Sequence, residues 1–172
     1  MSIRFLSASE WRLLRSARLD ALSESPASFL STFAAERQYG PPHWRAELTL
    51  GIWLIGTKDN DQTQTEALLG ATPGDDIPTT DRYLSSLWVT PSARRKGIAT
   101  RLVIDMVAHL RGLEVPQVWL WVVDGNADAD RLYRRLGFRR TGERKRLERD
   151  PLRCEERLRL DLSRPFGYVW QP

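Results

Sequence analysis

Residues 87–103, LWVTPSARRKGIATRLV, constrain the fold more than any other stretch of the chain. An apolar run stops at Pro91, passes through three consecutive bases and Gly97, and resumes with apolar residues at helical spacing. The run QVWLWVV at 117–123 follows and is apolar at both odd and even positions, as expected for a strand covered on both faces. This order predicts a strand, helix, strand crossover, whose two strands lie parallel.

The first 50 residues predict one short strand followed by helices. Residues 2–6 have strand-like alternation, and Ser7 with Glu10 has the spacing of a capping box that opens a helix through about Leu22. Ser25-Pro26 suggests a second helix start, which PPHWRAEL at 41–48 would continue after a break.

Between these helices and the crossover the pattern changes to short apolar runs. IWLI at 52–55, EALLGA at 66–71 and YLSSLWV at 83–89 are separated by polar loops, which predicts an antiparallel meander. Beyond the crossover, a helix with apolar residues at i, i+3, i+4 and i+7 ends at Gly137, and two strands within 138–162 flank an Asp150-Pro151 turn. The crossover helix itself is expected at about 97–111.

Composition limits the class of protein. The 172 residues suit one domain with a core at about 2–162 and a tail at 163–172. The single cysteine excludes an internal disulfide, and no secretory signal or membrane-length apolar run is visible, so we expect a cytoplasmic protein. A net charge of +4 admits nucleic acid or a phosphorylated small molecule as a partner. No aromatic-basic interleaving or recognition helix favours nucleic acid, and no membrane partner is expected.

The turn before the crossover helix has the features of an anion site. Backbone N–H groups are unpaired where a helix begins, and the helix dipole adds positive charge there. Arg94, Arg95 and Lys96 add formal charge, and Gly97 leaves the backbone uncovered. The pattern fits a phosphate or pyrophosphate site, and it also fits a solvated basic turn. It fits neither the P-loop nor the three-glycine dinucleotide fingerprint.

The second half of the chain resembles one family. RRKGIA at 94–99 matches the Arg/Gln-x-x-Gly-x-Gly/Ala signature of the GNAT superfamily, the acyl-CoA-dependent N-acyltransferases. LWVTP before it, WLWVVDGN at 119–126 and ADRLYRRLGF at 129–138 follow in that family's order and spacing. The resemblance covers about residues 2–162.

This resemblance implies an α/β fold of the α+β type. A mixed, mostly antiparallel sheet of about six or seven strands would carry about four helices, with its fourth and fifth strands parallel and splayed. Those strands would be about 83–90 and 117–123. The pantetheine arm of acetyl-CoA would lie in the wedge between them, bonded to the backbone of the fourth strand. The residues that the resemblance assigns to acetyl-CoA are Leu87, Trp88, Val89, Arg94, Arg95, Lys96, Gly97, Ile98, Ala99, Thr100, Asn126, Ala129 and Tyr133.

The resemblance also assigns chemical roles. The Val89 N–H would donate to the thioester oxygen, on which negative charge grows during acyl transfer. Tyr133 stands where the family's usual general acid stands, although its apolar neighbours also suit a core aromatic. Asn126 would contact the cofactor and also suits a helix N-cap.

The general base stays open at this stage. Many relatives place a glutamate on the fourth strand or reach the amine through ordered water, but this chain has Ser85 and Ser86 there. Glu66, Asp81 and Glu36 are further candidates. No His, Cys and Asp cluster has metal-ligand spacing, so no metal is expected.

The activity that the resemblance implies is N-acetyl transfer from acetyl-CoA to an amine, as in enzymes of EC class 2.3.1. A primary amine of a small molecule is expected first and a peptide or protein amine second, selected by residues 9–48 and 72–82. A catalytically silent acyl-CoA sensor of the same fold is the alternative, supported by the missing base. The protein is expected to be a monomer or homodimer.

Overall fold

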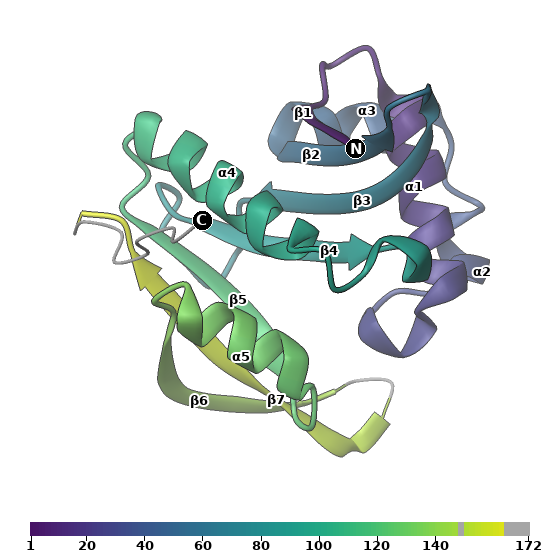
Figure 1. The fold of residues 1–172 in the computed structure, drawn as a ribbon. Helices are drawn as coiled ribbons and strands as arrows, with labels where there is room; N and C mark the ends of the chain where they lie inside the picture. The colour runs from purple at the N-terminus through teal and green to yellow at the C-terminus, as the bar shows by residue number, and fades with distance from the viewer. Residues whose placement is uncertain (148–149, 164–172) are drawn as a thin grey trace.

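Seven strands form one mixed sheet in the order β1-β2-β3-β4-β5-β7-β6 (Figure 1). The computed structural model describes residues 1–147 and 150–163. The strands are β1 (Ser2–Phe5), β2 (Ile52–Lys58), β3 (Asp61–Thr72), β4 (Arg82–Val89), β5 (Gln117–Val123), β6 (Arg139–Leu147) and β7 (Asp150–Asp161). The helices are α1 (Trp11–Glu24), α2 (Phe33–Glu36), α3 (Pro41–Leu50), α4 (Ile98–Gly112) and α5 (Ala127–Arg135). Among the strands that the structure describes, only β4 and β5 pair in parallel, so the predicted fold class is confirmed.

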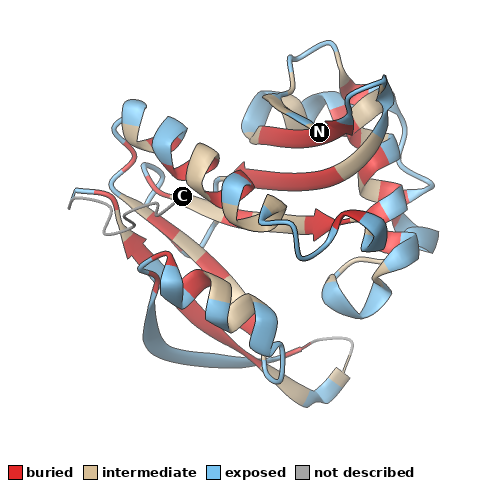
Figure 2. Cartoon of the chain, viewed as in Figure 1, coloured by how far each residue is buried: buried red, intermediate tan, exposed pale blue. Residues whose placement is uncertain are grey.

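The sheet is covered on both faces. Along β3, Ala67, Leu69 and Ala71 belong to the core cluster that α4 completes, whereas Leu68 belongs to the cluster formed with α1 and α3. This alternation follows from the two-residue period of a strand. Figure 2 shows the resulting band of buried residues along the central strands.

The parallel pair of β4 and β5 is short. Only Arg82 pairs with Val118 and Tyr83 with Trp119, and beyond these residues the strands diverge (Figure 1). The other edge of β5 stays paired along its whole length, from Gln117 opposite Asp161 to Val123 opposite Glu155. The divergence therefore opens the middle of the sheet while β5 remains supported by β7.

A β-bulge lies in β4 where the strands diverge. Leu68 pairs with Trp88 but Gly70 pairs with Ser85, so β4 contains one more residue than the facing stretch of β3. Ser86 within this interval has φ 62°, a left-handed conformation that non-glycine residues rarely adopt. Bulges of this kind bend a strand and re-aim its side chains.

The sequence located the elements well in the second half and less well in the first. The predicted helix at 97–111 and strand at 117–123 correspond to α4 and β5. The helix expected from Ser25-Pro26 is instead a 3-10 turn at Pro26–Ser28 followed by the one-turn helix α2. Asp150 and Pro151 begin β7 and are not the predicted turn, and the predicted tail lies outside the described residues except for Ser163.

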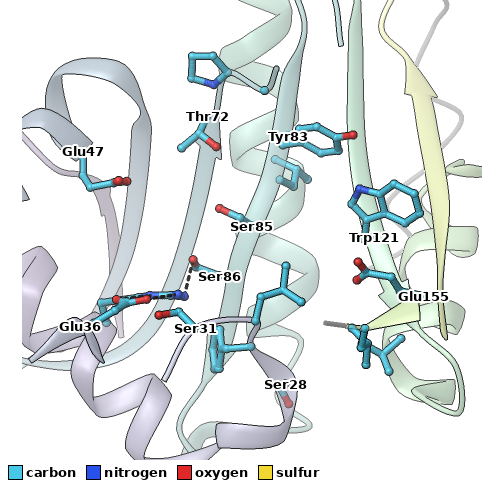
Figure 3. Close-up of a pocket in the computed structure, with 18 of the residues that line it drawn as sticks. Ser28, Ser31, Glu36, Glu47, Thr72, Tyr83, Ser85, Ser86, Trp121 and Glu155 are labelled. Atoms are coloured by element: carbon cyan, nitrogen blue, oxygen red, sulfur yellow. Dashed lines mark hydrogen bonds and ion pairs between the residues drawn. The ribbon is translucent and has the colours of Figure 1, made fainter. Parts of the chain in front are cut away.

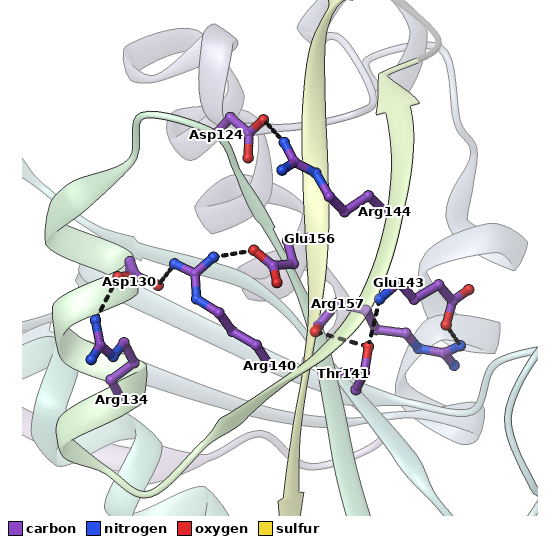
Figure 4. Close-up of polar contacts among 9 residues, drawn as sticks. All are labelled: Asp124, Asp130, Arg134, Arg140, Thr141, Glu143, Arg144, Glu156 and Arg157. Carbon is purple, nitrogen blue, oxygen red and sulfur yellow. Dashed lines mark hydrogen bonds and ion pairs between the residues drawn. The ribbon is translucent and has the colours of Figure 1, made fainter.

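The edge strand β6 is almost entirely exposed and strongly basic. Several of its charges are paired with neighbouring elements: Arg140 contacts Asp130 of α5 and Glu156 of β7, and Arg144 contacts Asp124 (Figure 4). Charged side chains on an edge strand oppose pairing with another chain. The described residues include no helix long and apolar enough to cross a membrane.

The capping box predicted at Ser7 is only half formed. The Glu10 carboxylate accepts from the Ser7 N–H at 2.8 Å, but the Ser7 hydroxyl donates to that same carboxylate and caps no helix N–H. Two further bonds, of 3.0 and 2.6 Å, run from the Arg4 guanidinium to Glu10. Glu10 thereby ties β1 to the start of α1, and the hydrogen bonds from Arg4 lower its pKa to about 2.

We predict that Glu10→Gln lowers the unfolding free energy at pH 7 by about 1 kcal/mol, the upper range for a partly exposed ion pair. The folded pKa lies below the unfolded value, so the stabilisation is complete above the unfolded pKa of 4.5 and is lost as pH falls through about 2. Urea unfolding should therefore show a difference between wild type and variant that narrows from pH 7 towards pH 2. Glu114→Gln, at an exposed position after α4, is the control. An unchanged difference across this range would contradict the assignment.

Candidate functional site

The edge of β4 that faces the gap presents unpaired backbone groups. The Thr90 N–H donates to the Glu66 carbonyl of β3 at 2.8 Å. Because backbone groups alternate sides along a strand, the N–H and C=O of Val89 face away from β3, into the gap. The backbone of Trp88, which pairs with Leu68, faces β3. The Val89 carbonyl already accepts from the Arg94 guanidinium at 2.8 Å.

The first turn of α4 lies at the end of this edge. The earliest bond of the helix runs from the Arg101 N–H to the Gly97 carbonyl at 3.0 Å, and no side chain caps the preceding N–H groups. The N–H groups of Ile98, Ala99 and Thr100 are thus available to a ligand. Gly97 has φ 77°, and no heavy atom lies within 4 Å of the place where its Cβ would be. The approach to this backbone is open.

Two of the three bases at this turn fold back onto the chain. Besides Val89, Arg94 contacts Glu24 and Ser25, and the Lys96 ammonium donates to the Ser92 carbonyl at 2.9 Å. These side chains shape the loop and do not extend over the start of α4. The turn therefore presents mainly N–H groups to an anion.

Tyr133 and Asn126 have structural roles in α5. Tyr133 is buried in the core cluster that α4 completes, its ring lies 5.3 Å from that of Phe138, and burial raises the pKa of its hydroxyl. The Asn126 side chain accepts from the Ala129 N–H at 3.1 Å and so caps the helix. The structure therefore shows the two structural roles that the sequence left open: Tyr133 is a core aromatic and Asn126 is a helix N-cap.

A cavity of about 1330 Å³ opens on the face of the sheet that carries α1 and α3, opposite the face that α4 covers. Figure 3 shows Ser85 and Ser86 of β4 on one side of it and Trp121 and Glu155 on the other. Segments from both regions expected to select the acceptor contribute to its wall, including residues 27–31 and 72–76. Its charged lining is mainly acidic: Glu36, Glu47, Asp75, Asp76, Asp150 and Glu155 outnumber Arg18, Lys145 and Arg153 among the described residues. Such a lining favours a cationic ligand.

The five candidates for a general base differ in position. Ser85 and Ser86 line the cavity, although the Ser86 hydroxyl accepts from Arg18 at 2.8 Å. Glu36 also lines it but is held by two nitrogens of the same guanidinium. Glu66 and Asp81 do not line it, and Asp81 is buried against the Trp119 indole N–H at 2.8 Å.

The sequence did not single out three residues of the cavity wall: Trp121, Lys145 and Glu155. Trp121 lies in a strand predicted as core, and Lys145 lies in a basic run that suits solvent. Glu155 precedes a stretch in which leucines alternate with charged residues, a pattern typical of a strand with one face in water. Glu155 and Arg157 are instead buried, because β6, the aromatic side chains of β5 and the loop before β4 cover that face. The signal available in the sequence was the run of charged residues at 155–157, which leaves no face of this part of the strand uncharged.

No group of metal-ligating side chains is found in residues 1–147 and 150–163.

We predict that Gly97→Ala destabilises the fold by about 1 kcal/mol, because an L-residue is strained at positive φ even where space is open. Gly112→Ala is the matched control, since this glycine ends α4, has equal space around it and lacks a positive φ. Alanine there should be neutral or stabilising. Chemical denaturation of both variants tests the difference, and equal effects would contradict it.

Comparisons with known proteins agree with this geometry. The model of the acetyltransferase (GNAT) family matches residues 19–138. A ribosomal-protein-alanine N-acetyltransferase from Brucella melitensis superposes with TM-score 0.69 at 18% identity, covering 94% of this chain and 99% of its own. The protein yncA from Salmonella typhimurium, solved with its cofactor acetyl-CoA, gives 0.71 at 16%, covering 100% and 97%. Arabidopsis thaliana NAA60 in complex with a bisubstrate analogue gives 0.67 at 17%, covering 93% and 98%.

No curated protein sequence gives a significant match. The family match spans more than half of the chain, and it includes the diverging strands and the open helix start described above. The chain therefore belongs to the GNAT family of acetyltransferases.

Proposed function

We propose that this protein transfers the acetyl group of acetyl-CoA to a primary amine, by direct attack of the amine while both substrates are bound. The observation that carries the proposal is the geometry of β4. It leaves β5 after two paired residues and turns the Val89 N–H into the gap, and the chain then continues into the uncapped start of α4.

The residues present fit acetyl-CoA. The gap edge of β4 at Leu87 and Val89 would hold the pantetheine arm through main-chain bonds. The N–H groups of residues 97–100 would hold the pyrophosphate, because a helix start favours anions and Gly97 leaves it accessible. Arg94 and Lys96 support the loop, and Arg95 lies at its exposed surface. When bound, acetyl-CoA supplies an acetyl group activated as a thioester.

The chain's own groups would then orient the reaction. The Val89 N–H is the donor that we assign to the acyl oxygen, and such donors act strongly because they are fixed before the reaction begins. We assign the proton for the departing sulfur to Tyr133. Burial raises its pKa, so the hydroxyl keeps its proton across the working pH range.

The acceptor would enter from the cavity on the other face. Its acidic lining supports an amine, which is cationic at neutral pH. Its volume of about 1330 Å³ exceeds the roughly 300–1,000 Å³ of ordinary small-molecule pockets. This size supports a second candidate, an amine carried by a peptide or protein, beside the small-molecule amine.

Acetyl-CoA should stabilise the native protein. At about 100 times its Kd the stabilisation is about 2.7 kcal/mol. For a chain of this size that corresponds to a rise of roughly 5–10 °C in Tm. Thermal unfolding with acetyl-CoA, and with adenosine as a control that lacks the pyrophosphate and the pantetheine arm, makes the measurement. No shift at millimolar acetyl-CoA would contradict the proposed groove.

The variant Tyr133→Phe tests whether Tyr133 acts as a general acid or only as a core aromatic. Thiol release followed over a panel of small amines and peptides should show kcat reduced about 100-fold, within the usual range for general acid catalysis. The acetyl-CoA thermal shift should persist, because the ring and its packing remain. Unchanged turnover would remove Tyr133 from the mechanism. If the wild type binds acetyl-CoA but releases no thiol with any amine, the silent-sensor alternative holds.

A further inference from the structure

Three side chains from three adjacent strands form one wall of the cavity. Trp121 lies on β5, Glu155 on β7 and Lys145 on β6; Val123 of β5 and Lys145 are the register partners of Glu155. Glu155 is only 3% exposed, whereas the Lys145 side chain is 48% exposed. A carboxylate is therefore buried in the wall, and a long cationic side chain reaches it from the edge of the sheet.

These side chains hold a primary ammonium group. The Lys145 Nζ lies 3.3 Å from Glu155 Oε1 and 4.2 Å from the centroid of the Trp121 ring. A carboxylate with an aromatic face beside it combines ion pairing with a cation–π contact, and both select a compact cation. The wall thus already accommodates the chemical group of a primary alkyl amine, supplied here by the protein itself.

This wall lies on the part of β5 that has left β4. Trp119 is the last β5 residue paired with β4, and Trp121 is the next residue on the same face. Tyr83 is the β4 residue paired with Trp119, so Ser85, two residues further along β4, corresponds to Trp121 across the gap. Figure 3 shows Trp121 and Glu155 on the side of the cavity opposite Ser85 and Ser86. The wall therefore lies across the cavity from β4, the strand to which the arm of acetyl-CoA is assigned above.

The other buried carboxylate of the cavity has a different environment. Glu36 is buried and is fixed by the guanidinium of the half-buried Arg18, whose charge is permanent. Lys145 reaches Glu155 by a half-exposed flexible stem, so an incoming ammonium can replace it.

We propose that Trp121 and Glu155 bind the acceptor as a primary alkylammonium in place of Lys145, and that Glu155 accepts its proton. This inference rests on the proposed acetyl transfer. Loss of one proton to the carboxylate frees the nitrogen lone pair, which forms the C–N bond as the C–S bond breaks. The sulfur leaves with the bonding electrons and takes a proton from Tyr133, and the nitrogen loses its second proton, which restores the tyrosine. Ammonium and thioester thereby give an amide, a thiol and one proton, held by Glu155 until solvent removes it.

Glu155→Gln tests the proton transfer. At pH 7 it should reduce kcat/KM for the amine about 100-fold, as expected for loss of a general base. The loss should shrink as pH rises towards the pKa of the amine, because a neutral amine needs no base. Glu114→Gln, at an exposed carboxylate after α4 that does not line the cavity, is the control. The acetyl-CoA thermal shift of Glu155→Gln should equal that of the wild type, so failure here is distinguishable from failure of the proposed function. A loss independent of pH, or no loss, would overturn the role of Glu155.

Lys145→Met tests the ammonium site without acetyl-CoA and without a known acceptor. This variant should lower Tm because it removes the ammonium group 3.3 Å from the Glu155 carboxylate and its contact with the Trp121 ring, and n-butylamine hydrochloride should restore the Tm. n-Butanol, which has the same chain and no charge, should not. Adding Glu155→Gln to the variant should abolish the rescue. Equal responses to the amine and the alcohol, or rescue that persists without the carboxylate, would overturn the site.

Discussion

The early separation of β4 from β5 is the constraint on which the rest of the molecule depends. Parallel strands normally continue their ladder, because each unpaired backbone group in a sheet interior must find another partner. Here the ladder ends after two residue pairs, at the bulge that places Ser86 in a left-handed conformation. The divergence leaves Val89 with an N–H directed into open space, an arrangement that serves a ligand better than it serves the isolated fold.

Two arginines support the gap, one on each side: Arg18, which is half-buried, and Arg157, which is buried. Arg18 of α1 bonds both Glu36 and Ser86, and so ties the bulge of β4 to the helices beside the cavity. Arg157 of β7 pairs with Glu143 of β6 and with Asp76 of the loop before β4, and its guanidinium packs against Trp119. Each arginine uses several donors at once, which fixes its neighbours in position. These contacts tie together the strands, helices and loops that surround the cavity.

The sequence predicted the side of the site formed by backbone better than the side formed by side chains. Strand, turn and helix at 87–103 can be read from apolar periodicity, Pro91 and Gly97, because these are local properties. The roles of Trp121, Lys145 and Glu155 depend on three strands meeting side by side, and alternation in one strand does not reveal what covers its outer face. For the same reason, the sequence does not show that Arg157 is buried. The bulge at Ser86 was also invisible, because serine carries no local signal for a left-handed backbone.

Hydrogen exchange at single amides of β4 tests the central claim most directly, namely that the edge of β4 facing the gap is the main-chain partner of acetyl-CoA. Without ligand, the Val89 N–H faces the gap, whereas the Thr90 N–H is bonded to Glu66 at 2.8 Å. Saturating acetyl-CoA should slow exchange at Val89 strongly and leave the protected Thr90 amide nearly unchanged. Equal exchange at Val89 with and without acetyl-CoA would contradict the account.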